Sequence, residues 1–225
     1  MVVNYKVFIA ACLFGLIAIP ACYAQKSLAA LNIDEIHVVN GMGWGFPISE
    51  TSQVLGPKYS TSLGLDVTMQ NKKFFLYPAL DFLSFKYTQL LPDDHSDYLI
   101  DNGTSSFLQL NLMAGFKKKL NNWGIYGYGG PLMGFVSEPK AQLSSADQIT
   151  LKNNYHFTGG VRIGGGTEYK LGSVYLFLDL SYYHNFSTIQ GKRVHAITGY
   201  GGLKTNITRV ADKVIEIISE LTQSP

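Results

Sequence analysis

Apolar and polar residues alternate along several segments of the chain. One segment carries apolar side chains at every second position: Leu63, Leu65, Val67 and Met69. The positions between them are small or polar: Ser62, Gly64, Asp66 and Thr68. Alternation with period two indicates a β-strand whose two faces meet different environments. The same pattern recurs around Leu110 and Leu178, and Gly41, Gly43 and Gly45 alternate with larger residues in the first segment.

Eight segments of this kind follow one another. They are Ile36–Ile48, Tyr59–Met69, Phe74–Tyr87, Phe107–Lys117, Trp123–Val136, Tyr155–Lys170, Val174–Phe186 and His195–Ile207. Most reach the roughly nine to eleven residues that a tilted strand needs to cross a bilayer. We therefore predict an all-β fold, an eight-stranded antiparallel up-and-down transmembrane β-barrel over residues 25–207.

The connections between the segments alternate in length. Three are very short: Gln70–Lys73, Leu120–Asn122 and Leu171–Ser173. Four are longer and polar: Ser49–Lys58, Leu91–Ser106, Ser137–Asn154 and Ser187–Val194. Short turns at one end and long loops at the other are typical of outer-membrane barrels, in which the turns face the periplasm. An even number of strands also brings both termini to the periplasmic end.

The alternation assigns residues to two faces of the barrel. Leu65, Leu110 and Leu178 are expected to contact lipid, and Ser62 and Asn111 to face the lumen. Eight charged residues are expected inside: Asp66, Asp81, Lys86, Lys117, Arg162, Glu168, Asp179 and Lys204. An eight-stranded barrel is just wide enough for side chains to fill it. Charges of both signs can then pair across the lumen, which predicts a filled interior and no wide pore.

Two segments do not fit a simple alternation. Asp81 and Lys86 have opposite parity, which predicts a bulge near Phe82 and Leu83. The fifth segment has no clear parity. Several aromatic residues are expected to form an interfacial belt: Trp44, Phe46, Tyr126, Tyr128, Tyr182, Tyr183 and His184.

The N-terminal residues 1–24 read as a cleaved signal peptide. Lys6 precedes the uncharged stretch Val7–Ile19, Pro20 ends that stretch, and Cys22 and Ala24 stand at the −3 and −1 positions of a cleavage site before Gln25. In the alternative, Cys22 belongs to a lipobox and is acylated. Both cysteines, Cys12 and Cys22, lie in this segment, so a thiol or thiolate–metal site is not expected in the mature chain.

Residues 208–225 are predicted to form a short amphipathic C-terminal helix. Its apolar face comprises Val210, Val214, Ile217, Ile218 and Leu221. Packing of this helix on the periplasmic rim is the first expectation, and contact with the membrane surface or a partner is the alternative.

Composition limits the classes of function. Charged residues make up 15% of the chain, against about a quarter in ordinary soluble domains. No second apolar run approaches the length of a transmembrane helix, and a net charge of +2 does not suggest a nucleic-acid partner. The mature chain is long enough for a single domain.

Three clusters of residues suggest particular chemistry. One loop contains several acidic residues and a histidine: Asp93, Asp94, His95, Asp97 and Asp101. Carboxylate oxygens of this kind are suitable ligands for calcium. Their spacing lacks the glycine-centred EF-hand pattern, so a solvated external loop is the simpler interpretation. Gly159–Gly166 is rich in glycine, but no strand–turn–helix unit follows it, which argues against a phosphate-binding loop. The third cluster, His184 and Ser187, lies at the outer end of the seventh segment.

Three segments carry a family resemblance: the glycine-rich Tyr155–Tyr169, His195–Lys204 and Gly127–Pro131. They are similar, in that order, to the sixth, last and fifth strands of the OmpA-like and porin-like eight-stranded outer-membrane barrels that are common in Bacteroidetes, and the chain resembles those proteins. The resemblance implies location in the outer membrane. It also implies contact with lipid and lipopolysaccharide and insertion by the barrel-assembly machinery. In one respect the chain departs from many such barrels, because it continues past Ile207 instead of ending on an aromatic residue of the last strand.

Two classes of function remain open, and a third is weaker. The first is a non-enzymatic barrel with no cofactor, serving envelope integrity, adhesion or binding through its outer loops to a ligand that the sequence does not identify. The second is a lipid-modifying enzyme similar to the lipid A deacylases, which place His-x-Ser near such a rim. Here the spacing is His-x-x-Ser, so no catalytic residue is assigned. The third is a soluble, lipocalin-like carrier, which would have the apolar face inside.

Overall fold

The computed structural model describes residues 33–70, 73–90, 99–143 and 149–208, most of which lie in β-strands. The elements are β1 (Ile33–Pro47), η1 (Ser49–Gln53), β2 (Leu55–Gly56), β3 (Lys58–Met69), β4 (Phe74–Tyr87), β5 (Gly103–Leu120), β6 (Trp123–Leu143), β7 (Ile149–Leu171), β8 (Val174–Ile189) and β9 (Lys192–Asn206). No helix within these ranges is long and apolar enough to cross a membrane. The predicted signal peptide falls outside the described residues. So does the predicted C-terminal helix, apart from Thr208.

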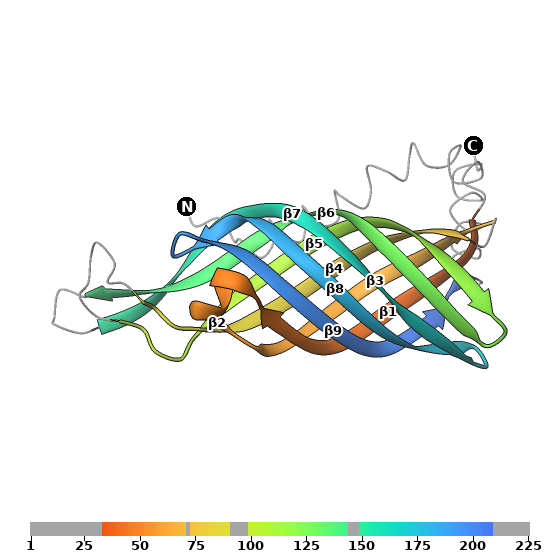
Figure 1. Cartoon of the computed structure of the whole chain (residues 1–225), viewed down its shortest axis with the longest axis horizontal. Coiled ribbons are helices and arrows are strands. Elements are labelled where there is room, and N and C mark those ends of the chain that lie inside the picture. The colour runs from red at the N-terminus through yellow and green to blue at the C-terminus, as the bar shows by residue number, and fades with distance from the viewer. Residues whose placement is uncertain (1–32, 71–72, 91–98, 144–148, 209–225) are drawn as a thin grey trace, which may run out of the picture.

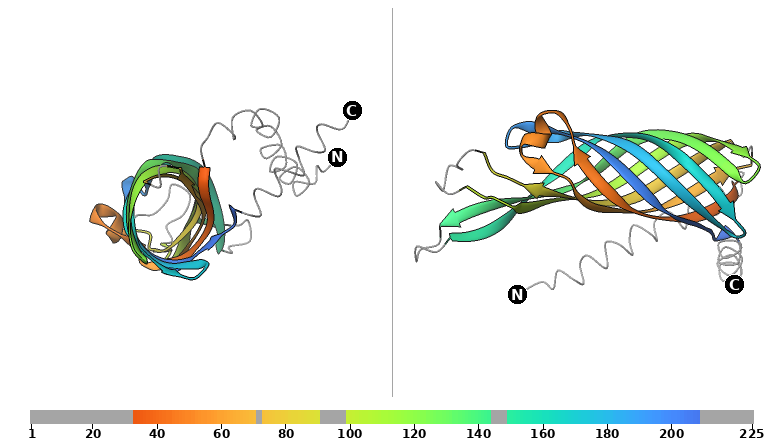
Figure 2. Two further views of the ribbon diagram at one scale, coloured as in Figure 1. Left: turned by 90° about the vertical axis from the view of Figure 1, so that its right-hand side faces the viewer. Right: turned by 60° about the horizontal axis from the view of Figure 1, so that its bottom comes forward.

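Eight of the strands form a closed antiparallel ring. Each pairs with its neighbours in the order β1, β3, β4, β5, β6, β7, β8 and β9, and β9 pairs back onto β1 from His37 opposite Asn206 to Pro47 opposite Ala196. The strands are tilted around the barrel axis (Figure 1), and the ring is seen end-on in Figure 2. Closure gives every strand a hydrogen-bonding partner on both sides, as hydrocarbon requires. The predicted eight-stranded barrel is confirmed, and the two-residue strand β2 is only a short addition beside β4.

The ends of the barrel differ as predicted. The start of β1 and the end of β9 lie at the same end as the short turns, because Ile33 is opposite Met69 and Thr205 is opposite Val174. Two of these turns are tight, with positive φ at Asn121 (56°) and Gly172 (64°), residues that tolerate the left-handed conformation. At the opposite end, η1 and β2 occupy the β1–β3 connection.

Two of the predicted long loops are largely strand. β6 and β7 remain paired up to Leu143 opposite Ile149, so most of the predicted loop Ser137–Asn154 is a hairpin that projects beyond the barrel (Figure 1). β8 and β9 join through Gln190 and Gly191, with φ of 49° and 74°, in a two-residue turn. The prediction of a loop over Ser187–Val194 was wrong. Strands outside the bilayer need no apolar outer face, so their alternation disappears from the sequence.

The predicted bulge in β4 is absent. The register of β4 against β5 runs without interruption from Phe74 opposite Phe116 to Tyr87 opposite Gly103. Asp81 faces the lumen and Lys86 the exterior, so the prediction that Lys86 lies inside was wrong. The lumen accepts large apolar side chains from this strand, Phe75, Tyr77, Leu83 and Phe85 among them. With apolar residues on both faces, the alternation of β4 cannot be seen in the sequence.

The fifth predicted segment, now in β6, has a regular parity after all. Its even-numbered residues from Gly124 to Glu138 face inwards, and odd-numbered ones such as Trp123 and Phe135 face outwards. The sequence conceals this because Leu132 and Val136 are apolar but point into the lumen, whereas outward positions include glycines.

Candidate functional site

The half of the lumen nearer the short turns is filled by a network of buried charges. Lys117 Nζ donates to both carboxylate oxygens of Asp66 at 2.8 Å and to Thr68 Oγ1 at 2.8 Å. Lys204 Nζ lies 3.2 Å from Asp66 Oδ2 and 2.8 Å from Glu168 Oε2. These residues come from β3, β5, β7 and β9, so the network joins strands across the barrel. Pairing satisfies charges that would otherwise be costly to bury.

A second network surrounds Arg162 in the middle of the lumen. Its Nη1 lies 2.8 Å from Asp81 Oδ2, and its Nη2 lies 3.5 Å from Asp179 Oδ1. Tyr183 donates to Asp81 at 2.5 Å and Tyr128 donates to Asp179 at 2.7 Å. The guanidinium also faces the Tyr183 ring, 4.9 Å from its centroid. Arg162 is only 1% exposed, so the network is sealed from solvent at this level.

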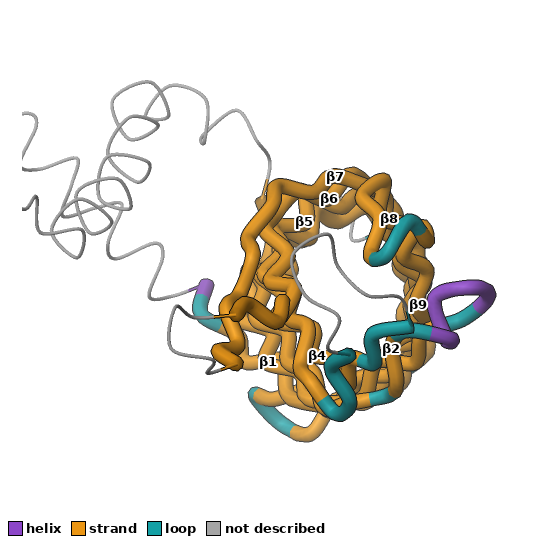
Figure 3. The backbone as a smooth tube through the Cα atoms, turned by 90° about the vertical axis from the view of Figure 1, so that its left-hand side faces the viewer, coloured by secondary structure: helices purple, strands orange, loops and turns teal. Residues whose placement is uncertain are grey.

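The lumen nearer the loops is packed with apolar side chains, with Leu83, Phe85, Phe107, Val136 and Ile189 all buried. At the mouth, Gln190 Nε2 donates to the Thr88 carbonyl at 2.9 Å, and Leu90 N donates to Gln190 Oε1 at 2.9 Å. These bonds tie the segment after β4 to the β8–β9 turn. Figure 3 shows the backbone at this end of the barrel.

Space inside the barrel is correspondingly small. A cavity lined by residues that include Val39, Tyr77 and Lys204 has a volume of about 10 Å³, no more than one water molecule needs. Seven of the eight charged residues that the sequence placed in the lumen are there, all but Lys86. The predictions of a filled lumen and of pairing across it are confirmed for the described residues.

Three tyrosines lie in the lumen instead of the expected aromatic belt. Tyr128 and Tyr183 are buried, and the ring of Tyr126 lies 4.2 Å from Lys204 Nζ. Their hydroxyl groups and ring faces are what the buried cations and carboxylates require as partners. Sequence alone could not separate them from interfacial tyrosines, since both kinds combine an apolar ring with a polar tip.

Inward-facing glycines of β7 make room for these rings. A Cβ atom added to Gly164 would lie 2.7 Å from Tyr128 Oη and 2.6 Å from Ser181 Cβ, and one added to Gly166 would lie 2.7 Å from Tyr126 Oη. A side chain at either position would collide with these rings and with the adjacent strand β8, where Ser181 Cβ and the Leu178 carbonyl are the nearest atoms.

Substitution of these glycines gives a direct test. Gly164→Val should destabilise the barrel by about 1–3 kcal/mol, the usual cost of overpacking. The matched control is Gly127→Val on the neighbouring strand, where the nearest atom to a new Cβ is 3.8 Å away. Urea unfolding of the two variants in detergent micelles measures the difference. Equal stability of the two variants would contradict the packing described.

The exterior of the barrel is apolar and arranged in bands. Large aliphatic side chains project outwards around its middle: Leu63, Leu110, Leu112, Ile163, Leu178 and Leu180. Pairs of aromatic side chains from neighbouring strands flank this band. Trp44 with Tyr59 (6.3 Å between ring centroids) and Phe135 with Phe157 (5.8 Å) lie towards the loop end. Trp123 with Tyr169 (4.8 Å) and Phe74 with Phe116 (5.6 Å) lie towards the turn end.

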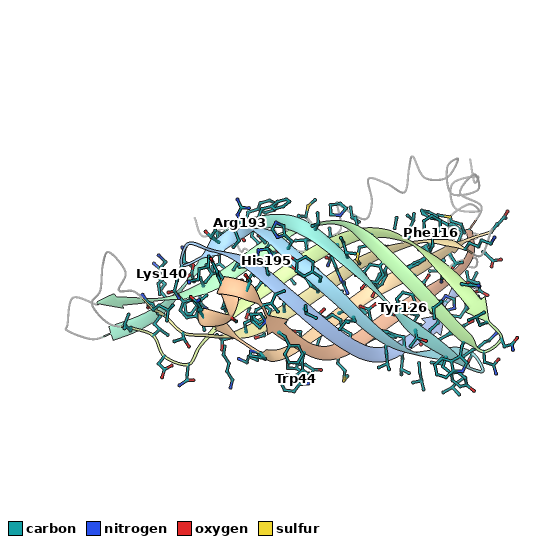
Figure 4. The ribbon with its side chains drawn as sticks, viewed as in Figure 1. Trp44, Phe116, Tyr126, Lys140, Arg193 and His195 are labelled. Carbon is teal, nitrogen blue, oxygen red and sulfur yellow. The ribbon has the colours of Figure 1, made fainter. Side chains whose placement is uncertain are left out.

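Figure 4 shows Trp44 on the outer surface and Phe116 near the turn end. An apolar band between aromatic girdles is the exterior of a membrane-spanning barrel. Leu65, Leu110 and Leu178 face outwards and Ser62 and Asn111 inwards, as predicted. A soluble carrier would have the reverse arrangement, so the lipocalin-like alternative is wrong.

His184 and Ser187 do not come together. His184 faces the exterior, where its Nδ1 lies 3.2 Å from Nδ1 of His195. Ser187 Oγ lies 2.7 Å from Oγ1 of the buried Thr158, on a neighbouring strand. Their odd spacing of three residues leaves them on opposite sides of the wall, and the register irregularity of β8 against β9 between His184 and Thr188 does not bring them together. The pairing of His184 with His195 was missed, because it depends on the register of β8 against β9, which alternation does not predict.

The remaining clusters supply no site within the described residues. Asp93, Asp94, His95 and Asp97 lie outside those residues, and Asp101 is exposed. No group of three or more His, Cys, Asp or Glu side chains in the described ranges is arranged to hold a metal ion. Gly159–Gly166 lies within strand β7, so it is no phosphate-binding loop.

Comparisons with known proteins agree with this architecture. No protein-family model and no curated protein matches the sequence. Among solved structures, the neisserial surface protein A is similar with a TM-score of 0.52 and 12% identity, covering 77% of this chain and 97% of its own. The attachment invasion locus protein Ail of Yersinia pestis, in complex with a heparin analogue, has a TM-score of 0.43 and 14% identity, covering 77% of this chain and 99% of its own. The closed ring of strands and the likeness to the neisserial protein show that the chain has the fold of the eight-stranded outer-membrane β-barrels.

Proposed function

We propose that the protein is an integral, non-enzymatic barrel of the Gram-negative outer membrane that acts through its outer end. The observation that carries this proposal is the combination of a lipid-compatible exterior with a lumen filled by paired charges and apolar side chains. A closed lumen leaves the two surfaces, lipid-facing and external, as places for function. Lipid and lipopolysaccharide are the partners of the first, and the assembly machinery is a transient partner during insertion.

The projecting β6–β7 hairpin is the feature most suited to external contact. β6 is 21 residues long and β7 is 23, about twice the length needed to cross a bilayer. The excess length lies beyond the barrel at the loop end (Figure 1). Paired strands hold such an extension in a defined shape, which lowers the entropic cost of binding a partner. Adhesion or ligand binding through this end is the role that the architecture supports best.

Shortening the hairpin tests this proposal. Replacing residues 139–153 by a two-residue turn keeps Glu138 opposite Asn154 and should leave the barrel folded and inserted, because no barrel-spanning part of β6 or β7 is removed. Cells producing the variant should lose surface attachment, measured against cells that produce the intact chain at the same level. The control is a strain that produces neither the intact nor the shortened chain. Undiminished attachment by the shortened form would contradict a binding role for the hairpin.

The lipid-modifying alternative receives little support from the outward His184 and the inward Ser187. A nucleophile and its base must lie within hydrogen-bond reach, and these two side chains are on opposite sides of the barrel wall. His184→Ala should therefore leave the lipid A profile of producing cells unchanged, as seen by mass spectrometry of extracted lipid A. An acyl chain that is missing with the intact chain and returns with the variant would support the enzyme instead.

A further inference from the structure

Two histidines on neighbouring strands face each other on the outer surface of the barrel. His184 of β8 and His195 of β9 are directly opposite in the strand register. Their Nδ1 atoms are 3.2 Å apart and their ring centroids 4.6 Å apart. Tyr182 lies on the same face, and its hydroxyl oxygen is 2.7 Å from Nδ1 of His195. Three polar side-chain atoms thus converge at one point of the outer surface.

Hydrogen bonding alone does not satisfy this arrangement. A neutral imidazole has one N–H donor and one acceptor nitrogen. If Nδ1 of His195 accepts from Tyr182, its lone pair is not free for His184. If it instead carries the proton, Tyr182 Oη and His184 Nδ1 compete for that one N–H. Protonating both rings would place two positive charges within about 5 Å of one another, which is unfavourable.

A metal cation can bind the lone pairs of both Nδ1 atoms, of His184 and of His195, at the same time. Metal–nitrogen bonds of about 2.0–2.1 Å place two ligands about 2.9 Å apart in square-planar geometry and about 3.4 Å apart in tetrahedral geometry. The observed 3.2 Å separation lies between these values. Imidazole binds metals through either ring nitrogen, and Tyr182 Oη is close enough to His195 to contribute an oxygen. The backbone needs no rearrangement, since the strand register already sets the spacing.

We infer that His184 and His195 form a surface binding site for a first-row transition-metal dication, with Cu²⁺ bound more tightly than Zn²⁺. Neutral imidazole ligands suit both ions, and Cu²⁺ stands highest in the general order of affinity. Two nitrogens leave coordination positions open to water or to anionic groups of neighbouring lipids. The site lies towards the outer end of β8 and β9 (Figure 4, His195), where an ion from the surroundings reaches it without crossing hydrocarbon.

Backbone hydrogen bonds fix the position of His195, and a neighbouring arginine opposes the binding of a cation. His195 N donates to Thr51 Oγ1 at 3.0 Å, and Ile48 N donates to the His195 carbonyl at 3.0 Å. These bonds hold β9 against the segment that contains η1. Arg193 is exposed on the same face of β9 as His195, and its positive charge repels a dication. Arg193→Gln should accordingly tighten binding.

Titration with Cu²⁺ and Zn²⁺ of the folded, detergent-solubilised barrel tests the site. Isothermal calorimetry should show one Cu²⁺ bound per chain, more tightly than Zn²⁺. His184→Gln and His195→Gln should each weaken Cu²⁺ binding at least about 10-fold, since even indirect losses at metal sites cost 10–100-fold. Electron paramagnetic resonance of the Cu²⁺ form should show two imidazole nitrogens in the intact chain and one in each variant.

His156→Gln is the matched control, because His156 belongs to β7 and has the inward-facing parity of that strand. It should bind Cu²⁺ as the intact chain does. Heat-modifiable gel migration establishes that each variant is folded before it is titrated. Binding that is the same in the intact chain, His184→Gln and His195→Gln would overturn the inference. So would a spectrum without nitrogen ligands. Neither result bears on the proposed role of the hairpin.

Discussion

Replacing Arg162 by Met should destabilise the barrel by about 3–5 kcal/mol, the usual consequence of removing one partner from a buried ion pair. Met fills much of the same space but leaves Asp81 and Asp179 without their cation. Both carboxylates are buried, at 0% and 7% exposure, so water cannot take the place of the guanidinium. Urea unfolding of the refolded barrel in detergent, followed by tryptophan fluorescence, gives the free-energy difference.

Two further variants identify the cause of that loss. Arg193→Met removes an arginine from an exposed position and should change the stability by no more than about 0.5 kcal/mol. The double variant Arg162→Met with Asp81→Asn removes a charge from each side and should be more stable than Arg162→Met alone. If the Arg162→Met variant were as stable as the intact protein, the Arg162 network would not be buried as described.

Replacing Leu110 by Arg should cost about 2–4 kcal/mol, because position 110 lies near the middle of β5 and faces lipid. Leu110 is 44% exposed on the outside of the barrel. The matched control is Leu120→Arg at the end of the same strand, also outward and 50% exposed. An arginine there reaches the interface and should cost only about 0–1 kcal/mol.

Depth in the bilayer is the only large difference between these two substitutions. Unfolding in lipid vesicles is therefore the measurement, since detergent micelles do not impose a fixed thickness. Equal costs at positions 110 and 120 would contradict a membrane-spanning position of β5. Arginine at Asn111 is a poor control, although the residue faces inwards, because Asn111 is fully buried and donates to Asp81 at 2.8 Å.

Alternation was sufficient to predict the strands whose inward faces are polar or small. In β3, Ser62, Asp66 and Thr68 face the lumen and leucines face outwards, so the two environments differ visibly in composition. In β4 the inward face includes Phe75, Tyr77 and Phe85, and the same reasoning produced a bulge that does not exist. Where apolar side chains point into the lumen, the inward and outward faces of a strand have similar composition. Alternation in the sequence then does not show which residues face inwards.

Contacts between strands were beyond the reach of the sequence. The pairing of Arg162 with Asp81 and the approach of His184 to His195 depend on register and on barrel closure. No local pattern encodes either of these. The length of the β6–β7 hairpin was also missed, since strands beyond the bilayer lose the apolar outer face from which spanning strands are recognised.

Separation of the membranes of producing cells, with gel migration before and after boiling, tests the central claim most directly. The account predicts recovery in the outer-membrane fraction and a faster-migrating band in unboiled samples, because a closed barrel stays folded in detergent until it is heated. Boiling should shift that band to the position of the unfolded chain. Recovery in the soluble periplasmic fraction, with one position before and after boiling, would contradict a membrane-spanning barrel.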